Sequence, residues 1–112
     1  MEWKKVVAII RENNLIAVQE RLKDLRMVFI NATRRKGYGE YTNLFAPDWS
    51  IMYARLEIYC EASQVEVIAQ IIMDTAHTGL AGDGIVTIAP VEKIYRIRNK
   101  VEVKYEGTMK EE

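Results

Sequence analysis

The apolar residues of this chain change their spacing twice, and this change limits the possible folds more than any other feature. Residues 4–11 are apolar on both alternating faces, as in a central strand that is covered on both sides. Within residues 15–25, Leu15, Val18 and Leu22 instead recur at helical spacing. The same succession of strand and helix returns in the second half of the chain. The sequence therefore predicts two strand–helix–strand units.

The expected elements, taken in order, describe one architecture. Ser63 and Glu66 form a capping box, which is typical of a helix start. Two βαβ-like halves predict a ferredoxin-like α+β sandwich, a βαββαβ fold whose antiparallel sheet carries two helices on one face. Strands are expected at residues 4–11, 27–36, 51–60 and 85–98, the last interrupted at Pro90, with helices at 15–25 and 65–76 and a short further strand at 101–105.

The length and the net charge of the chain limit its domain organisation and the classes of function that it can have. With 112 residues the chain is expected to form a single domain, 1–112, with a long loop at about 37–50 and a C-terminal tail at about 99–112. The 16 basic and 16 acidic residues cancel, which argues against a bulk affinity for nucleic acid or anionic lipid. The N-terminus does not resemble a signal peptide, and no apolar stretch approaches the roughly 20 residues that span a bilayer. We therefore expect a cytoplasmic protein with no direct membrane insertion.

Reactive side chains are few. One cysteine, Cys60, and one histidine, His77, make a poor zinc set, so no metal site is expected. No nucleophile, base and orienting group stand together as a catalytic triad requires. Glu57 is an acid among apolar neighbours in a strand, and it either meets a specific partner or faces solvent. The sequence thus favours a protein that is not an enzyme and has no catalytic residues.

The second face of the expected sheet needs a cover. In a sandwich of this kind the helices cover only one face, yet the first and third strands are apolar or aromatic on both faces. The other face would leave a large apolar patch in water. Self-association is the simplest way to bury such a patch, so we expect an oligomer.

Two segments could hold an anion. The stretch TGLAGDGIVTI contains Gly82, Asp83 and Gly84, and glycines let backbone N–H groups approach an anion, although they also simply make a turn. It is no Walker A loop, because the lysine and the Ser or Thr after the last glycine are absent. Arg96 and Arg98 fall on one face of the expected last strand, where two guanidinium groups suit a phosphate or carboxylate. Surface arginines that pair with nearby acids are the alternative.

The long loop carries both glycines and large apolar side chains. Gly37 and Gly39 stand at its root, next to a basic run. Leu44, Phe45 and Trp49 lie within it, and large apolar side chains in an exposed segment either fold back or await a partner. Long loops in compact domains tend to be functional. These three residues are therefore candidates for binding a partner protein.

Taken together, these motifs resemble those of the PII signal-transduction family, the nitrogen regulatory trimers. The resemblance covers about residues 4–98 and includes KKVVAII, LIAVQERL, KGYG and RLEIYC. Its most specific part is TAHTGLAGDGIVTIAPVEKIYRIR, in which the GDG, the apolar strand and the RIR have the spacing of the family's C-terminal signature. The resemblance implies a ferredoxin-like fold in a homotrimer whose sheets face inward, which would cover the second sheet face.

The resemblance also implies a function and a set of residues. Proteins of this kind bind adenine nucleotides in clefts between subunits, and their long loop moves with the ligand and docks on targets such as membrane transporters or metabolic enzymes. The GDG loop and the RIR arginines would face the phosphates, the root of the long loop would approach the nucleotide, and polar strand residues would lie by the adenine. The residues on the phosphate side would be Gly82, Asp83, Gly84, Arg96 and Arg98. The root of the loop would contribute Gly37 and Gly39. The adenine would lie by Glu57, Asn31 and Thr33 and by the backbone near Tyr59 and Cys60.

The chain departs from the family at several positions. Leu80 and Ile85 stand where the family has basic residues, so two phosphate partners are missing. Loss of a charged hydrogen bond costs about 1.5–3 kcal/mol, so we expect ADP or AMP to bind at least as well as ATP. Tyr41 and Tyr53 replace the glutamine and lysine of the family's 2-oxoglutarate site, so 2-oxoglutarate is not expected to bind.

The main hypothesis is therefore a cytoplasmic PII-like regulatory protein that binds an adenine nucleotide between subunits and regulates a partner through its long loop. Two alternatives stay open. A small nucleotide-processing enzyme could use the same cleft, although no base or metal cluster is evident. An RRM-like RNA binder could stack bases on its sheet, although the zero net charge and the absence of the RNP aromatic pattern argue against it.

Overall fold

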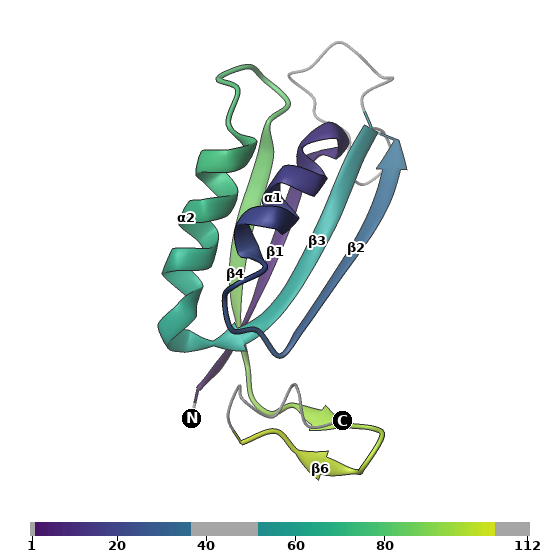
Figure 1. The fold of residues 1–112 in the computed structure, drawn as a ribbon, viewed down its shortest axis with the longest axis vertical. Helices are drawn as coiled ribbons and strands as arrows, with labels where there is room; N and C mark the ends of the chain where they lie inside the picture. Colours follow the sequence, from purple (N-terminus) through teal and green to yellow (C-terminus); the bar gives the residue numbers. More distant parts are fainter. Residues whose placement is uncertain (1, 37–51, 105–112) are drawn as a thin grey trace.

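Four long strands and two helices form the body of the protein in the computed structural model, which describes residues 2–36 and 52–104 (Figure 1). The sheet has the strand order β2-β3-β1-β4 with antiparallel neighbours, and both helices lie on one face. This is the expected ferredoxin-like arrangement, so the predicted fold class is confirmed. In chain order the elements are β1 (Trp3–Arg11), η1 (Glu12–Asn14), α1 (Leu15–Leu22), β2 (Phe29–Lys36), β3 (Met52–Glu61), η3 (Ala62–Gln64), α2 (Val65–Ala76), β4 (Gly84–Val91), β5 (Tyr95–Arg96) and β6 (Val101–Glu102).

The core lies between the sheet and the two helices. Because side chains alternate along a strand, every second residue of β1 and β3 points toward the helices. The apolar stripes of α1 and α2, which their helical spacing predicts, pack against these residues. Full burial of a Leu or Ile side chain contributes about 1.5–3 kcal/mol. The buried side chains include Val6, Ala8, Ile10, Ala54, Leu56, Ile58 and Cys60 from the strands, and Leu15, Val18, Leu22, Val65, Ile68, Ile72 and Ala76 from the helices.

The ends of the helices differ from the sequence prediction. α1 ends at Leu22 rather than Leu25, because the chain turns there, and the N–H of Leu25 donates to the carbonyl oxygen of Leu22 at 3.0 Å. Leu25 still packs against the core. The capping box is wrong as well: Ser63 lies inside η3, and Gln64 is the N-cap of α2 without a side-chain hydrogen bond. A 3-10 turn leads the chain into α2 in place of a side-chain cap.

The last long strand passes through Pro90 without a break. Among the described strands β4 pairs only with β1, where Pro90 lies opposite Lys4. On such an edge strand the missing N–H of proline can face solvent, which is why edge strands tolerate proline. The expected continuation to residue 98 is wrong, because the chain turns after β4 and forms the small β5–β6 hairpin. Arg96 therefore ends β5 and Arg98 lies in the following turn, not on one face of a single strand.

The second sheet face combines apolar and charged side chains. Val7 and Ile9 are partly buried there, whereas Phe29 and Ile85 near the two edges are 54% and 59% exposed. An ionic cluster around Glu57 interrupts these apolar side chains. The expected apolar patch is therefore smaller than the sequence suggests, and burial by self-association stays a prediction.

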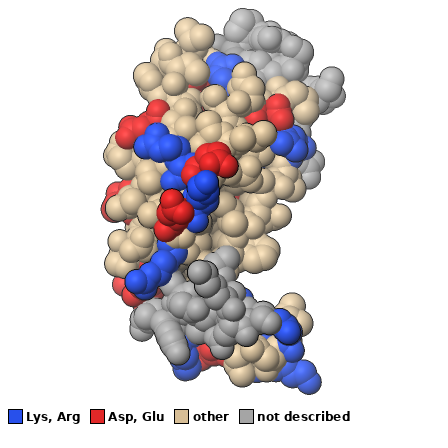
Figure 2. Space-filling view, viewed as in Figure 1, with Lys and Arg blue, Asp and Glu red and all other residues tan. Residues whose placement is uncertain are grey.

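Charged side chains of both signs are interspersed on the face of the molecule seen in Figure 2. This agrees with the formal net charge of zero and leaves no broad region of one sign on that face. A surface of this kind gives little nonspecific attraction to nucleic acid. Of the helices in the described part of the chain, none is long and apolar enough to cross a membrane.

Candidate functional site

One carboxylate closes the loop between α2 and β4. Asp83 accepts hydrogen bonds from the backbone N–H groups of Thr78 at 2.8 Å and of Gly79 at 2.9 Å, and from the Thr78 hydroxyl group. The Thr78 hydroxyl oxygen in turn accepts from the N–H of Leu80 at 3.1 Å. These bonds all lie within the loop, so the loop holds its shape without a ligand. A site that is formed before binding spends less free energy on ordering.

The same hydrogen bonds lower the pKa of the Asp83 carboxyl group well below its usual range. The Thr78 hydroxyl is the largest cause, followed by the N–H of Thr78, and the N–H of Gly79 and the Arg11 side chain act in the same direction. Burial acts in the opposite direction and is outweighed. Asp83 is therefore a carboxylate near neutral pH, and its charge is directed into the loop. Its role in the loop is structural, whether or not a ligand binds.

Two side chains from other strands attach this loop to the sheet. Arg11, at the end of β1, has its Nε 3.4 Å from Oδ1 of Asp83 and donates from Nη2 to the carbonyl oxygen of Ala81 at 2.7 Å. The buried hydroxyl of Tyr53 donates to the carbonyl oxygen of Gly82 at 3.1 Å. Neither contact was expected from the sequence. Strand order is the signal that could have found Arg11, since β4 begins beside the end of β1.

Backbone geometry explains two glycines of the GDG motif. Gly84 has a φ of +109°, and a Cβ at this position would lie 1.7 Å from the carbonyl oxygen of Ile9. Gly82 has a φ of +97°, which residues with a side chain rarely adopt. The interpretation of this stretch as a tight turn is confirmed, and anion binding stays a prediction.

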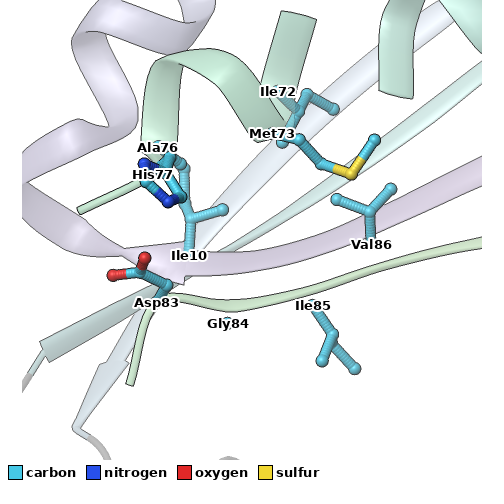
Figure 3. A pocket seen from close by; sticks show the side chains of 9 residues that line it. All are labelled: Ile10, Ile72, Met73, Ala76, His77, Asp83, Gly84, Ile85 and Val86. Carbon is cyan, nitrogen blue, oxygen red and sulfur yellow. The ribbon is translucent and has the colours of Figure 1, made fainter. Parts of the chain in front are cut away.

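A cavity of about 250 Å³ opens beside the loop (Figure 3). Aliphatic side chains from β1, α2 and β4 form its walls, and His77 and Asp83 bring polar side chains to one end. Ile85 points away from the other labelled side chains, to the opposite side of β4. Walls of this kind do not suit a phosphate group. Asp83 and Gly84 of the expected anion site therefore border a mainly apolar cavity.

Arg96 and Arg98 belong to the hairpin at the other end of the sheet (Figure 1). Both line a cavity of about 330 Å³ between this hairpin and residues of β2 and β3. Phe29 and Tyr59 line it too, with ring centroids 6.3 Å apart. Aromatic rings and guanidinium groups in one cavity suit a planar ring that carries an anionic group.

Glu57 lies in an ionic cluster on the open face of the sheet. Its Oε2 is 3.7 Å from Nζ of Lys5 and 3.4 Å from Nη1 of Arg55. In the neighbouring strand β2, Asn31 stands opposite Glu57 and Thr33 stands opposite Arg55. The structure therefore brings together the three residues that are expected by the adenine. It also gives Glu57 specific partners, so the alternative of an acid that faces only solvent is wrong.

Within one chain, the glycine loop and the arginines lie at opposite ends of β4 (Figure 1). The strand has 8 residues. A rise of about 3.3 Å per residue separates its ends by about 23 Å. A single phosphate group cannot contact both ends. The two groups can share a phosphate only if they come from different copies of the chain.

Several expected site residues cannot be placed. Gly37, Gly39, Tyr41, Leu44, Phe45 and Trp49 lie outside the described residues. In the part that is described, no three His, Cys, Asp or Glu side chains gather as a metal site requires. Cys60 is buried in the core.

Comparison with known proteins gives one consistent result. The family model "Nitrogen regulatory protein P-II" matches residues 3–101. The chain is 34% identical over 102 residues to the nitrogen regulatory protein P-II of Azospirillum brasilense, with 85% of this chain and 91% of the relative covered. It is 31% identical over 111 residues to the "Nitrogen fixation nifHD region GlnB-like protein 2" of Methanothermobacter marburgensis, with 85% and 92% covered. The solved structure of Arabidopsis thaliana PII bound to citrate matches with a TM-score of 0.74 and 25% identity, over 92% of this chain and 90% of that one.

Proposed function

Because this chain belongs to the nitrogen regulatory protein P-II family, we propose that it binds an adenine nucleotide between subunits and thereby regulates a partner protein. Its relatives are named as regulatory proteins and not as enzymes. The proposed partner is a membrane transporter or a metabolic enzyme, which the loop at about 37–50 contacts. The proposed assembly is a homotrimer.

The observation that carries this proposal is the separation of two complementary half-sites. One end of β4 carries a glycine loop that Asp83 holds in shape, and the chain beyond the other end carries Arg96 and Arg98. In a closed ring of copies, each contact joins two different surfaces of neighbouring subunits. A ring can thus set the glycine loop of one subunit beside the arginines of the next. Each cleft would then hold one complete nucleotide site.

The open sheet face offers groups for the base. Phe29 and Tyr59 line the cavity that the arginines also line, and an aromatic side chain under a nucleic-acid base contributes about 1–3 kcal/mol. Asn31, Thr33 and Glu57 lie on the same face, because Asn31 stands opposite Glu57 and Thr33 stands opposite Arg55, two residues before Glu57, in the register of β2 and β3. Their polar side chains can bind the base edge or the ribose. These residues support a nucleotide over a bare phosphate as the ligand.

The side chains around the glycine loop support a nucleotide with few phosphates. Leu80 and Ile85 are 69% and 59% exposed, and neither supplies positive charge. We therefore propose that ADP or AMP binds at least as well as ATP. We do not propose 2-oxoglutarate as an effector, since Tyr53, which stands where the resemblance implied a lysine, uses its hydroxyl to hold the loop at Gly82.

The long loop would report the bound nucleotide to the partner. Its root glycines, Gly37 and Gly39, directly follow β2, which pairs with β3 as far as Lys36 opposite Met52. A nucleotide shifts the loop between two states only if it contacts those states differently. A contact with the root would supply such a difference, and the apolar residues Leu44, Phe45 and Trp49 would then meet the partner.

Calorimetric titration with ATP, ADP and AMP tests the proposal. We expect saturable binding of at least one nucleotide. Arg96→Ala should weaken it about tenfold to a hundredfold, because a lost charge-assisted hydrogen bond costs about 1.5–3 kcal/mol. Lys93→Ala, which removes an exposed cation just before the hairpin, is the matched control and should change the affinity little. The absence of a heat of binding for all three nucleotides at high micromolar concentration would refute the proposal.

A further inference from the structure

The hairpin that carries the arginines is too small to be stable by itself. β5 and β6 have 2 residues each, and an isolated two-stranded hairpin is at best marginally stable in water. Its apolar side chains are mostly exposed, with Tyr95 at 60%, Ile97 at 92% and Val101 at 50%. Val103, which follows β6 directly, is only 2% exposed. Within the described part of this hairpin, Val103 is the buried apolar side chain.

Val103 packs in a small apolar cluster that is distinct from the main core. The other buried members are Trp3, in β1, and Val28, just before β2, each 3% exposed. The N–H of Val103 donates to the carbonyl oxygen of Ile94 at 2.8 Å, which closes the base of the hairpin. The cluster therefore fastens the hairpin to the end of the sheet where β1 begins (Figure 1).

The arginines stand between this anchor and a tight turn. The N–H of Lys100 donates to the carbonyl oxygen of Arg96 at 2.9 Å, and Lys100 has a φ of +59°. That conformation is uncommon for a residue with a side chain, so the surrounding contacts must enforce it. The positions of Arg96 and Arg98 thus depend on the turn and on the contact that Val103 makes with the body.

We infer that Val103 is a positioning residue for the nucleotide: its contact with Trp3 and Val28 holds Arg96 and Arg98 at the cavity between the hairpin and the sheet. Val103 does not itself line that cavity, and its inferred effect runs through the arginines, which do. The inference rests on the proposed function, because it assigns the arginines to the anionic part of a nucleotide. Release of the hairpin would move both cations away and leave the main core intact.

Two substitutions of the same kind in one hairpin test this inference. Val103→Ser removes the buried anchor, whereas Val101→Ser alters an exposed valine and serves as the control. The affinity for the best-bound adenine nucleotide should fall about tenfold or more in Val103→Ser, because the docked hairpin becomes a minor state. It should be unchanged in Val101→Ser and should return in Val103→Ile. Val103→Ser should add no further loss to the double variant Arg96→Ala/Arg98→Ala, since both arginines through which Val103 acts are then already removed.

Trp3 reports the anchor without any nucleotide. The chain has 2 tryptophans, so in a Trp49→Phe background Trp3 is the only indole that emits. Its fluorescence should shift to the red in Val103→Ser and not in Val101→Ser, with the circular dichroism of the main fold unchanged. No shift, or a shift with nucleotide binding as tight as in the wild type, would overturn the inference.

The same measurements separate this inference from the proposed function. If the wild type binds no adenine nucleotide, the proposed function fails and the positioning role fails with it. The red shift of Trp3 would then still show that Val103 anchors the hairpin. If the wild type binds the nucleotide and Val103→Ser does not, the proposed function and the positioning role of Val103 are both supported.

Discussion

Replacing Asp83 by asparagine keeps the size of the side chain but should destabilise the loop between α2 and β4. Oδ2 of Asp83 accepts from both backbone N–H groups, and Oδ1 meets the Thr78 hydroxyl and the guanidinium of Arg11. An asparagine keeps one carbonyl oxygen for the N–H groups of Thr78 and Gly79. Its NH₂ group, however, would face Arg11, which can only donate. The variant therefore loses both the negative charge and the ion pair.

We expect Asp83→Asn to lower the free energy of unfolding by about 1–2 kcal/mol. The side chains of Arg11 and Asp83 are 19% and 25% exposed. Solvent screening limits such a pair to about 0.5–1 kcal/mol. Each of the two backbone hydrogen bonds loses the part that the charge supplies, about 0.5 kcal/mol. Because the pKa of the folded carboxyl group lies below the ordinary value of about 3.9, the stabilisation is complete above that pH and is lost as the pH falls below it.

Urea unfolding at a fixed protein concentration measures this effect. At neutral pH the midpoint should fall by about 0.5–1 M with an unchanged slope. Asp74→Asn is the matched control, since Asp74 is an exposed acid on α2 that accepts only from Gln70 among the bonds described, at 3.0 Å. It should change the free energy of unfolding by less than about 0.5 kcal/mol. An Asp83→Asn variant as stable as the wild type, or a difference that persists undiminished near pH 3, would refute the role of this carboxylate.

Four further substitutions have defined outcomes. Leu80→Lys, at a position that is 69% exposed, should raise the affinity for ATP relative to AMP about tenfold in calorimetry, and an unchanged ratio would contradict the account of the missing cation. Gly84→Ala should lower the free energy of unfolding by more than about 3 kcal/mol, whereas Gly79→Ala, whose Cβ would lie 3.7 Å from the His77 ring, should lower it by only about 1–2 kcal/mol. Equal losses in urea unfolding would argue against the close contact at Gly84. Lys100→Gly should relieve the positive φ and stabilise the protein by about 0.5–1 kcal/mol, and thermal unfolding that shows no gain would contradict this strain.

The fold could be predicted because hydrophobic spacing records which face of each element is buried. Val6, Ala8 and Ile10 alternate along β1, and all three point into the core. The ends of elements depend on turn geometry, which spacing does not record. Leu25 fits the helical period, for example, yet it reaches the core from the turn after α1. Pro90 predicts an interruption of the strand, but β4 lies at the edge of the sheet, where a proline can be accommodated.

The candidate site was only partly predictable. The GDG motif shows that a tight turn follows α2, but the contacts that close it come from residues far away in the chain. Arg11 and Asp83 are 72 positions apart, and strand order alone brings them together. The alternation rule placed Arg96 and Arg98 on one strand, whereas the chain turns within that segment. Their distance from the glycine loop follows from the length of β4, so the two groups can share a phosphate only across the proposed contact between subunits.

A mixture of two disabled variants tests most directly whether two subunits hold one nucleotide. Leu80→Glu adds a negative charge to the glycine loop at an exposed position, and Arg96→Ala removes a cation from the hairpin. Each variant alone should bind the nucleotide weakly. When equal amounts are unfolded and refolded together, about a quarter of the clefts in a cyclic oligomer receive an unaltered loop from one subunit and an unaltered hairpin from the next.

Calorimetry of the refolded mixture should therefore show about a quarter of the sites at wild-type affinity. The two variants refolded separately and then combined serve as the control and should show no such sites. If the co-refolded mixture also shows none, while the wild type binds, the loop and the arginines do not meet across a subunit contact, and the central claim is contradicted.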